Sequence, residues 1–287
     1  MVKRLTKLCI SMILWLAETA IRSLLRTARI KLPASCVVLY YHVIKPDQRG
    51  RFDRQMDCLI KTAQPIAADE RPVLVHGARY AAVTFDDGFH ESILSAVPYL
   101  VRRNIPVTIF VPTGCIGFNA PWLKDDRQSH HHGGYVMNVE QIKKMAENRM
   151  VSFGSHCITH SNLLSLSEQE AENEIFRSKL QLEEILGIGI RTLSFPHGAF
   201  NPRHVEFAKA AGYERVFSIS PSLAFRRPDE YVTGRVRVDP MDWDIEFWLK
   251  LSGAYRWLSL ASWLKRKLRQ SVGIRFSSLK KPMGQAE

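Results

Sequence analysis

Residues 80–88 read YAAVTFDDG, a short apolar run that ends in two adjacent carboxylates and a glycine. A continuous apolar run of this length is typical of a parallel strand that is buried on both faces. Asp86 and Asp87 then stand at the carboxyl end of this strand, where α/β proteins collect their functional side chains. Asp-Asp-Gly is also an ordinary turn sequence, so by itself this stretch predicts a strand and not yet a site.

Similar apolar runs recur through the middle of the chain and alternate with helical patterns. Ser167 and Glu170 form a capping-box pattern that opens the longest predicted helix, and Asn138 with Gln141 forms another. The predicted strands cover residues 36–41, 80–85, 105–111, 151–154, 193–195, 216–219 and 231–238. Strands that alternate with helices in this way predict an α/β fold, either a parallel barrel or a doubly wound sheet.

The composition is that of an ordinary globular protein and excludes disordered, collagen-like and coiled-coil chains. Of the 287 residues, 46% are hydrophobic and 24% are charged. The formal net charge of +12 predicts attraction to an anionic partner, but no nucleic-acid-binding motif accompanies it, so we expect no nucleic acid. The five cysteines are an odd number without a Cys-x-x-Cys pair, which disfavours a disulfide framework and fits either a reducing compartment or simply small buried apolar residues.

Residues 1–32 are predicted to form a basic amphipathic helix outside the main domain. The apolar run at residues 8–17 is shorter than the roughly 20 residues that a membrane-spanning helix needs. One side of the helix is polar and the other apolar: Lys7, Ser11, Glu18, Arg22, Arg26 and Arg29 against Leu5, Leu8, Met12, Trp15, Leu16, Leu24 and Leu25. Such a helix either lies in a membrane interface or docks on the domain with a solvated charged face. A cleaved signal or a signal anchor is a third alternative, although Glu18 makes a poor cleavage site.

The segment 241–287 is also basic and holds four of the six tryptophans: Trp243, Trp248, Trp257 and Trp263. Tryptophan beside lysine and arginine suits a lipid headgroup region, so we expect a membrane-surface helix. The alternative is a core-packed helix with a solvated basic tail. Residues 33–240 between the two ends are predicted to form the main domain.

Imidazoles and carboxylates follow several predicted strands. His42 comes after the first strand, Asp86 and Asp87 after the second, and His156 and His160 after the fourth. On one helical turn the last two would face the same side and could hold one metal ion together with a carboxylate. We expect one of the two adjacent aspartates to bind the metal while the other, pointing the opposite way on an extended segment, acts as a base. The adjacent histidines His130, His131 and His132, by contrast, are predicted to be loop residues, because consecutive side chains rarely converge on one ion.

Three motifs in order resemble the polysaccharide deacetylase family, also called the NodB-homology or carbohydrate esterase family 4 domain. They are Thr84-Phe85-Asp86-Asp87-Gly88, Ser155-His156-Cys157-Ile158-Thr159-His160 and Phe195-Pro196-His197-Gly198. The resemblance covers roughly residues 36–238. It implies a distorted (β/α)7 barrel, here with amphipathic helices at both ends.

The resemblance also implies the role of each motif residue. Asp86 would be the catalytic base, and Asp87, His156 and His160 would bind a divalent metal ion, usually zinc. The third motif usually reads Pro-Tyr-Gly and its backbone N–H helps to hold the oxyanion, so His197 would take that role with a different ring.

Two further roles depend on positions where this chain departs from the common family pattern. Ser194 stands where many members have the arginine that supports the base, and Arg235 on a late strand is a substitute. No histidine follows His204, so the usual C-terminal source of the general acid is absent. One branch, which includes poly-N-acetylglucosamine deacetylases, supplies this histidine after the first strand. Residues 40–43, YYHV, resemble that branch and make His42 the candidate acid.

The resulting expectation is a metal-dependent deacetylase that hydrolyses the N-acetyl group of an amino sugar in a polysaccharide or lipid-linked glycan. The alternatives are a non-catalytic, membrane-associated glycan-binding module and a hydrolase of another acyl amide or ester. We expect attachment to the inner membrane on its cytoplasmic face, with a periplasmic signal-anchored form as the alternative. The sequence predicts no oligomeric state.

Overall fold

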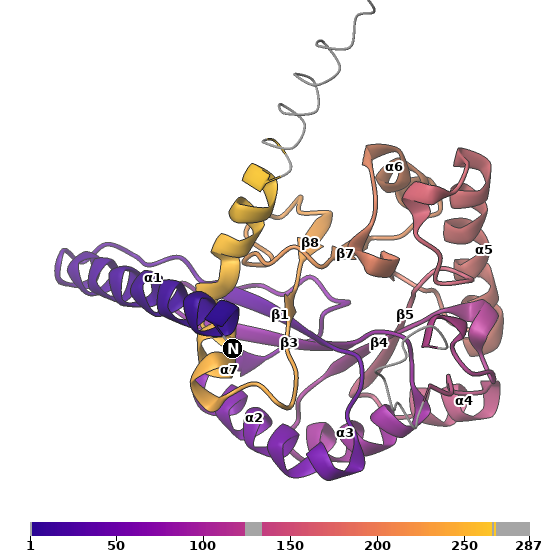
Figure 1. The fold of residues 1–287 in the computed structure, drawn as a ribbon, viewed down its shortest axis with the longest axis horizontal. Coiled ribbons are helices and arrows are strands. Elements are labelled where there is room, and N and C mark those ends of the chain that lie inside the picture. The colour runs from indigo at the N-terminus through magenta and orange to yellow at the C-terminus, as the bar shows by residue number, and fades with distance from the viewer. Residues whose placement is uncertain (1, 124–133, 266, 268–287) are drawn as a thin grey trace, which may run out of the picture.

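A computed structural model describes residues 2–123, 134–265 and 267. Its centre is a parallel sheet in which the strands follow the order β8-β7-β6-β5-β4-β3-β1-β9, with the short β2 paired to β3 (Figure 1). The strands are β1 Ser35–Tyr41, β2 Gln64–Pro65, β3 Arg79–Phe85, β4 Val107–Val111, β5 Val151–Ser155, β6 Thr192–Ser194, β7 Arg215–Ser218, β8 Val232–Gly234 and β9 Val236–Arg237. Apart from the two-residue strands β2 and β9, the strands are buried at most positions, as expected for strands covered on both faces.

The two edges of this sheet are joined by a single extended segment. β8 pairs with β7 and β9 pairs with β1, and only Arg235 separates β8 from β9 along the chain. The backbone N–H of Arg235 donates to Ser218 O at 3.1 Å, and that of Val238 donates to Tyr40 O at 3.1 Å. The sheet is therefore a nearly closed barrel of seven strand units, and the expected (β/α)7 barrel is confirmed.

Helices surround the barrel and follow most of its strands (Figure 1). They are α1 Val2–Thr27, α2 Arg49–Thr62, α3 His90–Arg102, α4 Val139–Ala146, α5 Glu168–Leu186, α6 Pro202–Ala210 and α7 Asp244–Leu251. The capping boxes predicted at Asn138 and Ser167 are both formed. α2 was not predicted, because its few core-facing residues stand among charged ones: only Phe52, Gln55, Met56 and Leu59 are buried.

The N-terminal helix α1 is docked on the C-terminal part of the chain. Trp15 packs edge-on against Trp248 with ring centroids 4.6 Å apart, and Trp257 Nε1 donates to Ser11 Oγ at 2.9 Å. Glu18 pairs with Arg256 at 2.7 Å. Residues 241–258 therefore pack against α1 and the domain, as the core-packed alternative predicts. Beyond residue 258 the same segment carries exposed apolar residues.

The outward face of α1 differs from the sequence-based expectation. Docking turns the polar residues Ser11 and Glu18 toward the domain, so only part of the expected charged face is solvated, and Lys7, Arg26 and Arg29 remain exposed. Apolar residues also face outward, with Ile13, Leu16 and Leu24 exposed by 65%, 54% and 70%. The helix also extends well beyond residues 8–17, and its 26 residues are long and apolar enough to cross a membrane by length and composition. The expectation that the segment is too short to span was therefore wrong.

Two sequence-based expectations cannot be placed in this fold. His130, His131 and His132 lie outside the described residues, as does the C-terminal tail from residue 268 onward.

Gly234, at the end of β8, lets the closing segment lie close to the β7–β8 connection. A Cβ at this position would stand 2.1 Å from the backbone oxygen of Ser220. We expect Gly234→Ala to lower the free energy of unfolding by about 1–3 kcal/mol, because neighbouring backbone must move. Denaturant unfolding measures this change. Gly50→Ala in α2, where a Cβ meets nothing within 4 Å, is the matched control and should be neutral or slightly stabilising; equal effects of the two would contradict the tight closure.

Candidate active site

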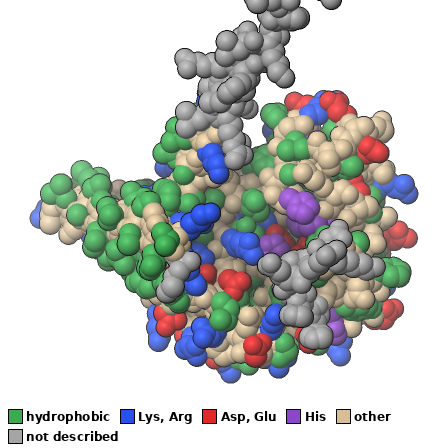
Figure 2. Space-filling view, in the orientation of Figure 1, with side chains coloured by type: hydrophobic (Ala, Val, Ile, Leu, Met, Phe, Trp, Pro, Cys, Tyr) green, Lys and Arg blue, Asp and Glu red, His purple; other side chains and the backbone are tan. Residues whose placement is uncertain are grey.

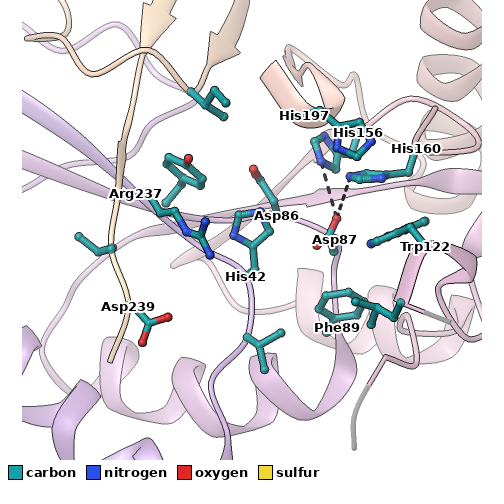
Figure 3. Close-up of a pocket in the computed structure, with 15 residues that line it drawn as sticks. His42, Asp86, Asp87, Phe89, Trp122, His156, His160, His197, Arg237 and Asp239 are labelled. Atoms are coloured by element: carbon teal, nitrogen blue, oxygen red, sulfur yellow. Dashed lines mark ion pairs between the residues drawn. The ribbon is translucent and has the colours of Figure 1, made fainter. Parts of the chain in front are cut away.

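A cavity of about 370 Å³ opens at the carboxyl ends of the barrel strands (Figure 3). Its walls come from segments far apart in the sequence, each of which follows a strand or bridges two. The lining residues that matter below are His42, Asp86, Asp87, Trp122, His156, His160, His197 and Arg237. Except for Arg235, which lies in the barrel beneath, the cavity contains every side chain that the sequence singled out for catalysis or metal binding.

Asp87, His156 and His160 form a compact set of potential metal ligands. Their ligand atoms all lie within 4.8 Å of one another. Asp87 Oδ1 is 3.3 Å from His160 Nε2 and 3.8 Å from His156 Nε2 (Figure 3). Asp87 Oδ1 is also buried without a hydrogen-bond partner, which is costly unless a cation completes the site. Two imidazoles, one carboxylate and an adjoining open cavity fit a catalytic divalent metal site.

The surroundings keep both histidines in the form that binds a metal. His156 Nδ1 donates to Ser194 O at 2.6 Å, which leaves Nε2 free to face Asp87. Burial lowers the pKa of His156 to about 4. Burial together with the neighbouring His156 and His197 lowers the pKa of His160 to about 2. Both rings are therefore neutral near pH 7.

Burial and the adjacent Asp86 raise the pKa of Asp87 well above its usual value. This carboxyl group is thus poorly stabilised as an anion by the protein alone. A bound dication would instead favour the anionic form of Asp87, because the ion would be the largest charge in the site.

The backbone that presents these ligands is not the one the spacing predicted. His156 and His160 lie on an irregular turn after β5, not on a helix, with Cys157 at φ 62° and His160 at φ 61°. Asp87 has φ 68°, so the Asp86–Asp87 segment is a tight turn instead of an extended strand. The expected helical turn at His156–His160 and the expected extended segment at Asp86–Asp87 were therefore both wrong. The side chains still converge, because the turn after β3 and the turn after β5 lie at the same end of the sheet and face each other.

A carboxylate on α5 holds the His156–His160 turn in place. Glu174 accepts hydrogen bonds from the backbone N–H groups of Ile158 and Thr159 at 2.8 and 2.9 Å, and from Thr159 Oγ1 at 2.8 Å. It is buried, with 8% of its surface exposed. Sequence analysis missed Glu174, because its partners are backbone groups that only the fold brings within reach.

Asp86 and Arg235 form a buried ion pair beneath the cavity. Arg235 Nη1 donates to Asp86 Oδ1 at 2.7 Å and Nη2 donates to Oδ2 at 2.8 Å. Arg235 also donates to Thr84 Oγ1 and to Ser194 Oγ, and none of its surface is exposed. Burial alone would raise the pKa of Asp86, but Arg235 and the nearby His156 outweigh it and hold this pKa well below its usual value. Asp86 is therefore an anion at every pH near neutrality.

His42 and His197 stand on opposite sides of the two aspartates (Figure 3). His42 follows β1, and its ring lies edge-on to that of Tyr40 at 5.5 Å. Burial lowers the pKa of His42, although the charge of Asp86 acts in the opposite direction. The ring of His197 packs edge-on to His160 at 4.5 Å, and its backbone has φ 57°. The following Gly198 is required, because a Cβ there would stand 2.3 Å from Ile219.

Trp122 and Arg237 were not singled out by the sequence but both line the cavity. The Trp122 ring stacks on His160 at 4.0 Å with an interplanar angle of 23°. A tryptophan inside an otherwise polar loop was the available signal, because loops rarely carry large aromatic groups without a packing or binding role. Arg237 is the last residue of β9 and was indistinguishable from other surface arginines.

Known proteins resemble this chain in sequence and in fold. Residues 75–216 match the family model of polysaccharide deacetylases. The chain is 27% identical over 223 residues to the protein YxkH of Bacillus subtilis (strain 168), covering 72% of this chain and 73% of YxkH. It is 22% identical over 166 residues to the poly-beta-1,6-N-acetyl-D-glucosamine N-deacetylase of Staphylococcus aureus (strain MSSA476), covering 54% of this chain and 53% of that enzyme.

Solved structures give the same picture. IcaB from Ammonifex degensii superposes with a TM-score of 0.64 and 26% identity, covering 78% of this chain and 98% of IcaB. BC0361 from Bacillus cereus superposes with a TM-score of 0.61 at 20% identity, covering 76% of this chain and 69% of BC0361, which supports the fold.

Glu174 provides a test of how the ligand turn is held. We expect Glu174→Gln to weaken the affinity for a divalent metal ion about 10- to 100-fold, because the amide nitrogen of glutamine cannot accept a hydrogen bond and one of the three contacts is lost. Competitive titration against a chelator measures the affinity. Glu184→Gln, at an exposed position of the same helix, is the charge-matched control. Unchanged affinity in Glu174→Gln would mean that the turn needs no support from α5.

Proposed function

This chain carries a polysaccharide deacetylase domain, and from that premise we propose that it removes the acetyl group from an N-acetylated amino sugar in a polysaccharide or lipid-linked glycan. One observation carries the proposal. A buried carboxylate, Asp86, stands beside the Asp87–His156–His160 ligand set at the floor of a single open cavity. A non-catalytic glycan-binding module has no need for a base that is kept anionic by a buried arginine.

The proposed reaction begins with water and the acetyl carbonyl above the ligand set. A divalent cation held by Asp87, His156 and His160 would polarise the carbonyl and acidify the attacking water, so that a carboxylate of low basicity suffices. Asp86 accepts the proton of that water, and Arg235 fixes both oxygens of Asp86 in the required direction. For the metal we propose zinc, because two imidazole nitrogens and one carboxylate match its preferred donors.

The remaining steps use residues on both sides of Asp86. The backbone N–H of His197 donates to the oxyanion that forms on the former carbonyl oxygen. His42 delivers a proton to the leaving amine. The proton comes from the imidazolium form of His42, which is left as the neutral ring. Burial lowers the pKa of His42 and disfavours the imidazolium form, whereas the negative charge of Asp86 before reaction favours it.

The shape of the cleft favours a polymeric substrate. Two further cavities adjoin the catalytic one and share Asp239 with it, and one of them also shares Val238 and Arg237. They extend the cleft to Arg4 and Lys7 in the first turns of α1. The similarity to poly-beta-1,6-N-acetyl-D-glucosamine N-deacetylases supports a glycan built from N-acetylglucosamine.

We also propose that α1 attaches the protein to a membrane surface. Figure 2 shows the apolar outer face of α1, which projects from the barrel. Contacts of α1 with the domain run from Arg4 to Glu18, and a helix that keeps them lies along the domain more readily than it crosses a bilayer alone. The five cysteines are free thiols, which supports the cytoplasmic face of the inner membrane.

Asp86→Asn tests the catalytic proposal. We expect acetate release from N-acetylated glucosamine oligosaccharides to fall by about 10²–10⁴-fold, because the amide cannot accept the proton of water. Metal content, measured by mass spectrometry, should be unchanged, since Asp86 is not in the ligand set. Full activity in this variant would refute the assignment of the base. Bound metal without acetate release from any glycan by the unaltered protein would instead favour the binding module.

Leu16→Glu with Leu24→Glu tests the membrane proposal. We expect the unaltered protein to sediment with membranes and to be released by alkali, and the double variant to remain in the soluble fraction, because two charges on the outer face of α1 oppose insertion. Leu180→Glu, at a position of α5 that is 61% exposed, is the control and should still sediment. Release of the unaltered protein only by detergent would indicate a spanning helix. Cleavage by protease added outside intact spheroplasts would contradict the cytoplasmic face.

A further inference from the structure

A second cavity, of about 520 Å³, lies at the opposite end of the barrel from the catalytic site. Its walls are the segments that lead into strands: residues 33–34 before β1, residues 71–76 before β3, Arg215 at the start of β7, and residues 225–228 before β8. The amino-terminal ends of parallel strands all meet here. No part of this cavity is needed for acetyl hydrolysis.

The lining of this cavity is cationic. It contains Arg71, His76, Arg215, Arg226 and Arg227, and none of its lining residues is acidic. Among the described residues, Arg71, Arg215 and Arg226 form no ion pair within 4 Å, while Arg227 pairs with Asp229 at 3.5 Å on the exposed side. The remaining wall is mostly apolar, formed by Pro33, Ala34, Pro72, Val73, Leu74, Phe225 and Pro228.

Arg215 is the fixed centre of the cluster. Only 4% of its surface is exposed, its guanidinium lies 4.3 Å from the centre of the Phe225 ring, and Nη1 donates to the backbone oxygens of Ala68 and Glu70. Its Nε is buried without a hydrogen-bond partner. A buried guanidinium usually has a carboxylate partner, since the energetic penalty of an unpaired charge is large.

Arg71 adds a second positive charge close to the first. Burial lowers the pKa of Arg215, and repulsion from Arg71 lowers it further. The carboxylate of Glu230 partly offsets these influences, but it already accepts hydrogen bonds from the backbone N–H groups of Phe225 and Arg226 and from Thr233 Oγ1. Arg71 is held in place by its hydrogen bond to Pro228 O at 3.1 Å. The loops therefore fix like charges beside one another, an arrangement that an anion would stabilise.

We propose that this cavity binds a phosphate group carried by a small organic ester or by a phospholipid headgroup. Guanidinium groups offer paired N–H donors that match phosphate oxygens, and several of them around one cavity are typical of phosphate recognition. The neighbouring surface favours the lipid source. Val73, Val75 and Ile30 are exposed by 92%, 63% and 54%, and Ile30 follows the C-terminal end of α1.

The test uses the full-length protein and the double variant Arg71→Gln/Arg226→Gln. Both side chains are exposed at the cavity mouth, so their loss should leave the fold intact. Arg51→Gln/Arg149→Gln removes the same charge from exposed positions outside the described cavities and is the matched control. Two probes separate the sources: glycerol 3-phosphate by calorimetry, and phosphatidylcholine vesicles with or without phosphatidylglycerol by sedimentation.

We expect the Arg71/Arg226 variant to lose at least about 10-fold in affinity for a phosphate-bearing probe, because each charge-assisted hydrogen bond contributes strongly to binding. The control should change by less than about 2-fold. Loss for glycerol 3-phosphate supports a small-ester site, and loss confined to phosphatidylglycerol vesicles supports a headgroup site. Equal affinities of the two double variants would overturn the proposal. So would an unaltered protein that neither binds glycerol 3-phosphate nor binds vesicles with phosphatidylglycerol better than vesicles without it. Acetate release from soluble oligosaccharides should be the same in all three proteins, so this result is independent of the catalytic proposal.

Discussion

The ion pair between Arg235 and Asp86 connects the closure of the barrel to the chemistry of its cavity. Arg235 lies between β8 and β9, the two halves of the segment that joins the sheet edges. Its guanidinium is enclosed by the rings of Tyr40, Phe110 and Phe217 and reaches Asp86 with two hydrogen bonds. Removing one member of such a pair would leave a buried charge alone, which typically lowers the free energy of unfolding by about 3–5 kcal/mol. The same contact fixes the orientation and charge of the carboxylate.

Backbone strain is concentrated around the cavity. Asp87, Cys157, His160 and His197 all have positive φ, although none of them is glycine. Conformations of this kind persist only where the surroundings impose them, and they are common at functional sites. Here Glu174 on α5 and the ends of β4 and β5 supply the hydrogen bonds that hold the turns. The turns aim the ligand atoms at one point between them.

The basic character of the chain is distributed among several places with different roles. Arg235 is neutralised inside the barrel by Asp86, and Arg4 and Arg256 tie α1 to the domain through Glu246 and Glu18. The arginines at the amino-terminal end of the barrel, by contrast, are largely without acidic partners among the described residues. A formal net charge of +12 is therefore partly structural and partly available to anionic ligands and surfaces.

The sequence by itself determined a parallel α/β fold and the identities of the groups at the carboxyl end of its sheet, and the three motifs, through the family they resemble, narrowed the fold to a barrel. Apolar runs indicate strands that are buried on both faces. Polar residues that directly follow such runs lie together at the carboxyl ends of the parallel strands. Their positions in the sequence were therefore enough to find His42, Asp86, Asp87, His156 and His160. The helical turn and the extended aspartate pair inferred from spacing were wrong, because residue spacing does not reveal positive φ. Only the tertiary structure placed Glu174 against the backbone of the turn that carries His156 and His160, placed Trp122 against the His160 ring, and turned the apolar side of α1 outward. These features depend on contacts between segments distant in the chain, which local patterns do not encode.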